Sequence, residues 1–102
     1  MLEKLQSLED KYNELTELLS TPEVINDQSR FQKYAKAHAD LNDIVAAYIE
    51  YKKVLQQTQD IRQMLEENDD EEFRQMLVEE AEELRVKKED LEQQLKILLL
   101  PK

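Results

Sequence analysis

The sequence predicts an all-α protein, and three observations lead to that prediction. None of the 102 residues is glycine, where ordinary usage of about 7% would supply roughly seven. Apolar residues recur at spacings of three and four, the period of an amphipathic helix. No segment shows the apolar and polar alternation that is typical of a strand. We therefore expect one domain over residues 1–102, an elongated, coiled-coil-like antiparallel helical hairpin or three-helix bundle.

The first predicted helix covers about residues 2–19 and is followed by a short helical turn. Its apolar stripe consists of Leu2, Leu5, Leu8, Tyr12, Leu15, Leu18 and Leu19. Pro22 ends this helix, because the residue before a proline disfavours helical geometry. Proline also suits the first position of a new helix, so we expect Thr21 to cap a turn over about residues 22–26.

The second predicted helix covers about residues 28–66, with Asn26 or Asp27 as its N-cap. No proline or glycine interrupts it. Its apolar positions are Phe31, Tyr34, Leu41, Ile44, Val45, Tyr48, Leu55, Ile61 and Leu65.

The third predicted helix covers about residues 70–99, after a polar cluster in which Asn68 or Asp69 can act as the cap. Its apolar positions are Phe73, Met76, Leu77, Ala81, Leu84, Leu91, Leu95 and Leu98. Short connections make successive helices antiparallel neighbours. The second and third helices should therefore form a long hairpin, with the first helix covering part of it near Pro22.

The charge of the chain opposes binding to nucleic acid over most of its surface. The net charge is −10, and residues 68–102 carry 11 acids against six bases, a balance of −5. A partner of this last third is therefore expected to be basic protein surface, and no DNA partner is expected. The longest apolar run, Ile97 to Leu100, is too short to span a membrane, and the N-terminus lacks the basic start and apolar stretch of a signal peptide. Together with the absence of cysteine, this favours a cytoplasmic protein without a membrane partner.

The residues needed for common catalytic sites are missing. The chain has one histidine, His38, and no cysteine, so no nucleophile can be matched with its base. Phosphate-binding loops require glycine, and the Glu-x-x-His pairs of di-metal bundles do not occur. We predict that this chain is not an enzyme and binds no cofactor or metal, with His38 in a structural role.

Four acids in the third helix form a candidate binding face for a partner protein. Glu79, Glu80, Glu82 and Glu83 flank the apolar seam, and next-neighbour carboxylates on a helix point in different directions. A solvated acidic face that contributes to partner choice is therefore favoured over a metal or general-acid site. Within the same helix, Glu83 is expected to pair with Lys87.

Two further groups of residues have a structural and a functional interpretation. The basic residues Lys52, Lys53, Arg85, Lys87 and Lys88 are the only candidates for a phosphate-facing patch, but pairing with nearby acids is favoured. Phe31, Tyr34, Tyr48 and Tyr51 could stack on bases. Their helical spacing favours core packing instead.

The chain resembles the N-terminal domain of bacterial class I peptide chain release factors, and most closely the factor 1 branch. The resemblance covers all 102 residues. It is most specific at the Pro22 turn and at the C-terminal end. The residues that carry it are Leu18-Leu19-Ser20-Thr21-Pro22-Glu23-Val24-Ile25-Asn26-Asp27, Arg30-Phe31-Gln32-Lys33-Tyr34, Met64-Leu65 before an acidic turn, and Leu91-Glu92-Gln93-Gln94-Leu95-Lys96-Ile97-Leu98-Leu99-Leu100-Pro101-Lys102.

The resemblance implies that the chain is the first domain of a longer protein that terminates translation at UAA and UAG codons. The family's Gly-Gly-Gln and Pro-x-Thr motifs match no position here, so no catalytic or codon-reading residue is carried over. The resemblance implies a place on the factor-binding side of the ribosome, near the stalk base, and communication with the class II release factor, a GTPase.

Two other interpretations stay open. A free-standing coiled-coil adaptor would show the same helical pattern, and the factor 2 branch has an equivalent helical domain. The Leu-Leu-Leu-Pro-Lys ending is the reason for preferring the factor 1 branch. Self-association of the isolated chain through its C-terminal leucines also stays open.

Overall fold

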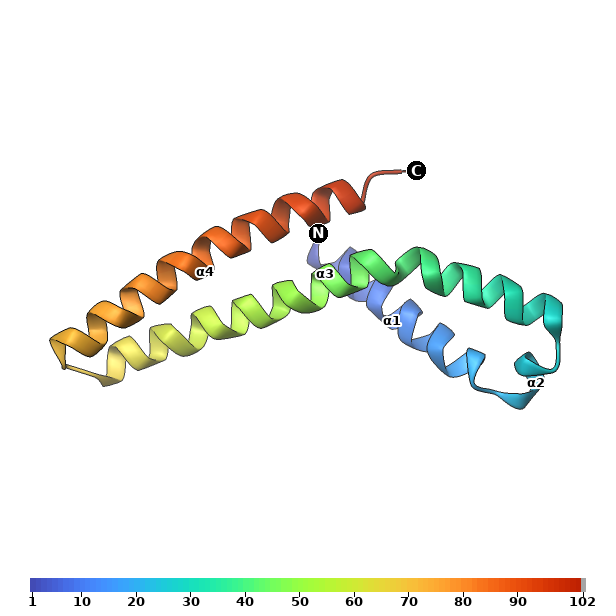
Figure 1. Ribbon diagram of the computed structural model, residues 1–102, viewed down its shortest axis with the longest axis horizontal. Helices are drawn as coiled ribbons and strands as arrows, with labels where there is room; N and C mark the ends of the chain where they lie inside the picture. Colours follow the sequence, from blue (N-terminus) through green and yellow to red (C-terminus); the bar gives the residue numbers. More distant parts are fainter. Residues whose placement is uncertain (102) are drawn as a thin grey trace. The chain divides into compact units, whose positions relative to one another are not determined.

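The computed structural model describes residues 1–101. Within that range the regular secondary structure is α-helical, without strands (Figure 1). The all-α prediction is therefore confirmed. The elements, in chain order, are α1 (Leu2–Leu19), α2 (Pro22–Ile25), α3 (Gln28–Glu67) and α4 (Glu71–Leu98). Their ends lie within one residue of the predicted ones. Lys102, the last residue of the C-terminal family motif, lies outside the described residues.

The chain divides into two compact units, Met1–Ala46 and Ala47–Lys102, and α3 contributes its first part to one and its second part to the other. In the first unit, α1 is antiparallel to the beginning of α3, with α2 in the connection (Figure 1). The buried apolar side chains of this unit are Leu5, Leu15, Val24, Ile44 and Val45. Leu2, by contrast, lies half exposed at the start of the stripe.

The connections around α2 show which of the predicted caps form. Thr21 has the extended backbone of an N-cap, but its hydroxyl donates to the carbonyl of Leu18 at 2.8 Å and does not cap α2. Asp27 caps α3, because its Oδ1 accepts from the backbone N–H of Arg30 at 3.2 Å. Thr21 is thus the N-cap residue of α2, as predicted, without a side-chain cap hydrogen bond, and Asp27 is one of the two residues predicted to cap α3.

The second unit is an antiparallel hairpin in which α4 runs back along the end of α3 (Figure 1). Its core consists of Val54 and Ile61 from α3 with Leu77 and Leu84 from α4. The half-buried residues packed against this core are Leu65, Ala81 and Leu91. The spacing of seven residues within each pair places both side chains on the same helix face, so the leucine stripe forms the inner seam of the hairpin.

Arg74 closes the turn between α3 and α4. Its guanidinium Nη1 donates to the backbone carbonyl of Leu65 and, at 2.9 Å, to that of Asn68. A cation there also complements the partial negative charge at the end of α3. Asn68 caps the same end by donating from Nδ2 to the carbonyl of Met64 at 2.8 Å. The prediction that Asn68 or Asp69 caps the last helix was wrong, because Asp70 takes that position, without a side-chain hydrogen bond.

Candidate functional site

The four acids predicted as a binding face lie on α4 in the second unit, and all four are exposed. Glu79, Glu80 and Glu83 have no ion-pair or hydrogen-bond partner among residues 1–101. These three carboxylates are open to a partner. Glu82 differs from them.

Glu82 is neutralised by Arg85, one turn further along α4. The Arg85 Nε and Nη2 donate to the two carboxylate oxygens of Glu82 at 3.0 and 2.7 Å. The Arg85 Nη1 donates to Glu89 at 2.8 Å. The hydrogen bond from Arg85, and then its charge, hold the pKa of Glu82 below its usual value. The acidic face therefore consists of three open carboxylates beside an ion-paired one.

Four of the five basic candidates pair with residues of their own unit, whereas the Lys88 side chain has no hydrogen bond or ion pair within residues 1–101. Lys87 Nζ lies 3.9 Å from Glu50 Oε2 on α3 and not against Glu83, so the predicted Glu83 pair was wrong. Lys53 Nζ lies 3.5 Å from the other oxygen of Glu50. Lys52 stands over the Tyr48 ring, 4.7 Å from its centroid. These pairings favour the structural interpretation of the basic residues.

The four aromatic residues of α3 do not form a stacking platform. Tyr48 and Tyr51 are buried, as the core interpretation predicts, and Tyr34 is half-buried. Phe31 is exposed, so core packing was the wrong prediction for this residue. The Tyr51 hydroxyl donates to Glu92 Oε2 on α4 at 2.8 Å. This bond joins the two helices of the hairpin at the edge of the core.

The Tyr51 hydroxyl makes the stability of the hairpin fall at high pH. Burial, and then the hydrogen bond to Glu92 and its negative charge, raise the pKa of Tyr51 from 10.0 to about 12. The folded state thus holds this proton more tightly than the unfolded chain does. The resulting stability is fully present below a pH of about 10 and is lost as the pH rises through about 12.

We therefore expect the urea midpoint of the wild-type chain to fall more steeply between these pH values than that of Tyr51→Phe, which has no proton to lose. Because both proteins keep the same lysines, the comparison removes the contribution of lysine titration to the pH dependence of the urea midpoint. Parallel curves for the two proteins would contradict the assignment.

His38 lies in a polar and aromatic cluster between α1 and α3 in the first unit. Its ring stacks on Tyr12 with the centroids 4.0 Å apart and 19° between the planes. Thr16 has a single hydroxyl proton, which it donates to the Tyr12 carbonyl at 2.9 Å, so His38 Nε2 donates to Thr16 Oγ1 at 2.8 Å. The Tyr12 hydroxyl donates to Asn42 Oδ1 at 2.7 Å. These contacts favour the structural role predicted for His38.

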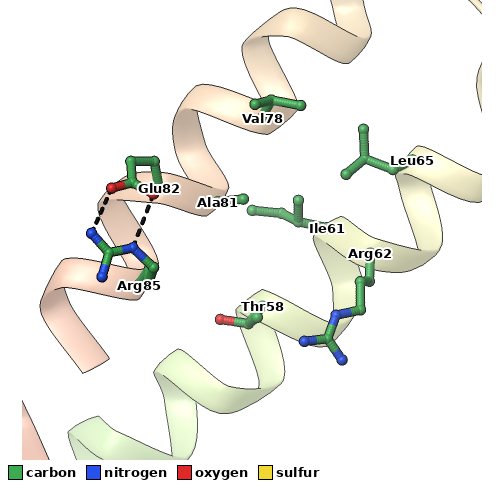
Figure 2. Close-up of a pocket in the computed structure, with 8 residues that line it drawn as sticks. All are labelled: Thr58, Ile61, Arg62, Leu65, Val78, Ala81, Glu82 and Arg85. Carbon is green, nitrogen blue, oxygen red and sulfur yellow. Dashed lines mark hydrogen bonds and ion pairs between the residues drawn. The ribbon is translucent and has the colours of Figure 1, made fainter. Parts of the chain in front are cut away.

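A shallow groove between α3 and α4 was not predicted from the sequence (Figure 2). Figure 2 shows Ile61 and Ala81 facing each other across it, with Val78 and Leu65 beside them. The remaining lining residues are Thr58, Arg62, Glu82 and Arg85. Ala81 is the one sequence feature that could have predicted this groove, because its small side chain in a seam of leucines leaves space between the two helices.

Neither a metal site nor a membrane span is found in the described residues. No three carboxylate, histidine or cysteine side chains of residues 1–101 lie close enough together to hold a metal ion. No helix in this range is long and apolar enough to cross a membrane.

Antiparallel helix pairs with exposed, charged faces define this chain as an all-α protein of the helical hairpin class. More particularly, the chain belongs to the PCRF domain family, which matches residues 8–102. The family resemblance seen in the sequence motifs is thus confirmed.

Several relatives share the whole length of the chain. A protein named peptide chain release factor 1 from Syntrophomonas wolfei is 62% identical over 101 residues, which is 99% of this chain and 28% of that protein. Proteins of the same name from Oceanobacillus iheyensis and Clostridioides difficile are 51% and 49% identical over 102 residues, 100% of this chain and 29% of each protein. The chain thus spans less than a third of the length of these relatives. No solved structure matches it.

Proposed function

We propose that this chain is the N-terminal domain of a peptide chain release factor that directs translation termination at UAA and UAG codons in the cytoplasm. The observation that carries the proposal is the match over the whole chain to relatives named peptide chain release factor 1, with up to 62% identity. In this proposal the domain binds the ribosome, and the chemistry of peptide release belongs to other domains.

The composition and the structure support a binding role and not a catalytic one. The chain has no glycine with which to build a Gly-Gly-Gln loop. Its one histidine is half-buried against Tyr12 and Thr16, and the Thr16 hydroxyl donates its proton to the Tyr12 carbonyl and not to the imidazole, so the two do not form a nucleophile and base pair. What the chain presents to a partner is charge and apolar surface.

We propose that the acidic face of α4, residues Glu79, Glu80, Glu82 and Glu83, binds a basic protein at the factor-binding side of the ribosome, near the stalk base. The same face would serve communication with the class II release factor GTPase. Its support is the exposure of all four carboxylates and the absence of a cation beside three of them. Complementary charge speeds association and selects partners.

The test measures binding and peptide release separately on purified ribosomes stalled at a UAA codon. We expect the 102-residue chain to bind these ribosomes and to compete with a full-length release factor, without releasing peptide by itself. Release by the chain alone would contradict the non-catalytic assignment. Failure to bind or compete would contradict the proposed function.

Charge reversal tests the acidic face in the full-length factor. Changing Glu79, Glu80, Glu82 and Glu83 to lysine is expected to weaken ribosome or GTPase binding roughly tenfold, with a reduced dependence on salt. The matched control reverses four exposed acids elsewhere, namely Glu17, Glu23, Asp43 and Glu66. Equal binding by the two variants would contradict the proposal that the acidic face binds the partner.

A further inference from the structure

The side of α4 that faces away from the hairpin core carries a regular stripe, here called the outer stripe. Its residues follow one another at alternating spacings of four and three, so they line up along the helix. They are Glu72, Met76, Glu79, Glu83, Val86, Asp90, Gln93 and Ile97. At 1.5 Å per residue the stripe is about 38 Å long. It includes two of the four residues of the acidic face.

The outer stripe lies opposite the buried seam of the same helix. Glu79, Val86 and Ile97 each follow a buried leucine by two residues, which is a rotation of about 200° around an α-helix. The buried leucines are Leu77, Leu84 and Leu95. A stripe on that side cannot be covered by the hairpin itself.

The apolar side chains of the outer stripe are exposed. Met76, Val86 and Ile97 are 64%, 45% and 66% exposed. They occupy the same period of 3.5 residues that packs one helix against another. α4 thus has one apolar stripe that packs inside the hairpin. On the opposite side it has a mixed stripe of three apolar residues, four acids and one glutamine, which has no partner in residues 1–101.

The carboxylates of the outer stripe also lack partners, whereas some of the exposed carboxylates of α3 have them. Asp60 and Glu67 of α3 accept hydrogen bonds from glutamines one turn earlier, each at 3.0 Å. Glu72, Glu79, Glu83 and Asp90 have no hydrogen bond or ion pair within residues 1–101. The stripe contains no lysine or arginine. It therefore presents uncompensated negative charge beside exposed apolar groups.

We propose that the outer stripe docks a basic amphipathic helix of a partner protein. The partner's apolar side chains pack between Met76, Val86 and Ile97, and its lysines or arginines pair with the carboxylates of the stripe. A helix fits because the spacing of 3.5 residues is that of helix-on-helix packing, and basic residues fit because the stripe carries charge of one sign. The inference rests on the proposed function in one respect, which is that the partner helix is expected to belong to a basic surface of the ribosome or of another factor.

The first experiment uses a labelled synthetic 21-residue helix as the probe, with leucines at heptad positions and lysines beside them. Fluorescence anisotropy measures its binding to the 102-residue chain. Changing Met76 and Val86 together to glutamate adds two negative charges, so attraction by charge alone would become stronger. Helix docking predicts the opposite, a roughly tenfold loss of affinity.

The matched control makes the same charge change at Ile49 and Met64, which are 40% and 41% exposed on α3. We expect this variant to bind the probe at least as tightly as the wild type. If the chain does not bind the probe, or if the Met76 and Val86 variant binds it as tightly as the control does, the proposal is overturned. Circular dichroism of every variant verifies the helical content.

Two more measurements test the position of the binding surface and the identity of the occupant. Glu79→Gln with Glu83→Gln should weaken probe binding more than Glu80→Gln with Glu82→Gln, and equal losses would count against the stripe. In sedimentation, a wild-type dimer that dissociates in the Met76 and Val86 variant would make a second copy the occupant and overturn the proposal.

Purified ribosomes then test the source of the partner. Loss of ribosome binding in the Met76 and Val86 variant supports the whole proposal. If the variant loses the probe but the wild-type chain does not bind ribosomes, the outer stripe is supported and the proposed function fails. If all variants bind ribosomes equally well, the outer stripe is not the surface that is used, and the proposed function stands without it.

Discussion

Replacing Leu77 by alanine is expected to lower the free energy of unfolding by about 2–5 kcal/mol, because the change removes buried methyl groups and leaves a cavity. Leu77 is buried in the hairpin core with Val54, Ile61 and Leu84. Native domains have a total stability of about 5–15 kcal/mol, so this loss would be a large fraction of it. Urea unfolding followed by circular dichroism measures the change.

The neighbouring residue provides the control. Met76 precedes Leu77 in the same helix, and it is 64% exposed. Met76→Ala is expected to change the free energy of unfolding by no more than about 0.5 kcal/mol. Similar losses for the two variants would mean that the inner seam and the outer stripe of α4 have been assigned to the wrong sides.

Replacing Arg74 by alanine is expected to lower the free energy of unfolding by about 1.5–3 kcal/mol, the range for hydrogen bonds made by charged groups. Arg74 is half-buried, and its guanidinium binds two carbonyls at the end of α3. Without it, the carbonyls of Leu65 and Asn68 lose a partner in a part of the turn that is only partly open to water. The same urea unfolding measurement applies.

Arg62 is the matched control for Arg74. It is an exposed arginine on α3 at the rim of the groove, with no hydrogen bond or ion pair in the described part of the chain (Figure 2). Arg62→Ala removes the same side chain and the same charge, and we expect a change within about 0.5 kcal/mol. An equal effect of both substitutions would show that net charge, and not the closed turn, accounts for the loss.

Local features made the helices predictable. The end of α1 and the start of α2 follow from Pro22, whose ring fixes its own backbone and restricts Thr21. α3 runs without a break because no proline or glycine lies between its ends. The caps were harder to predict. Thr21 and Asn68 bond backwards to Leu18 and Met64, since a short polar side chain near a helix end can reach donors or acceptors on either side.

The candidate site was predictable in its position but not in its pairing. The acids of the face lie where the helical period places them, outside the seam. Arg85 and Lys87 are both within reach of acids on their own helix, and the sequence alone does not choose between the pairs. Arg85 binds Glu82 and Glu89, whereas Lys87 approaches Glu50 of α3. That second contact depends on which residues of the two helices lie side by side.

The helices, the inner seam and the family motifs could be read from the amino-acid sequence, because each of these depends on residues within a few turns of one another. The tertiary structure was needed to show that Arg74 closes the turn, that Lys87 approaches Glu50, and that Tyr51 bonds Glu92. These contacts depend on the rotation and alignment of one helix against the next. A repeating leucine pattern restricts that alignment but does not choose a single one, since neighbouring registers bury similar apolar surface.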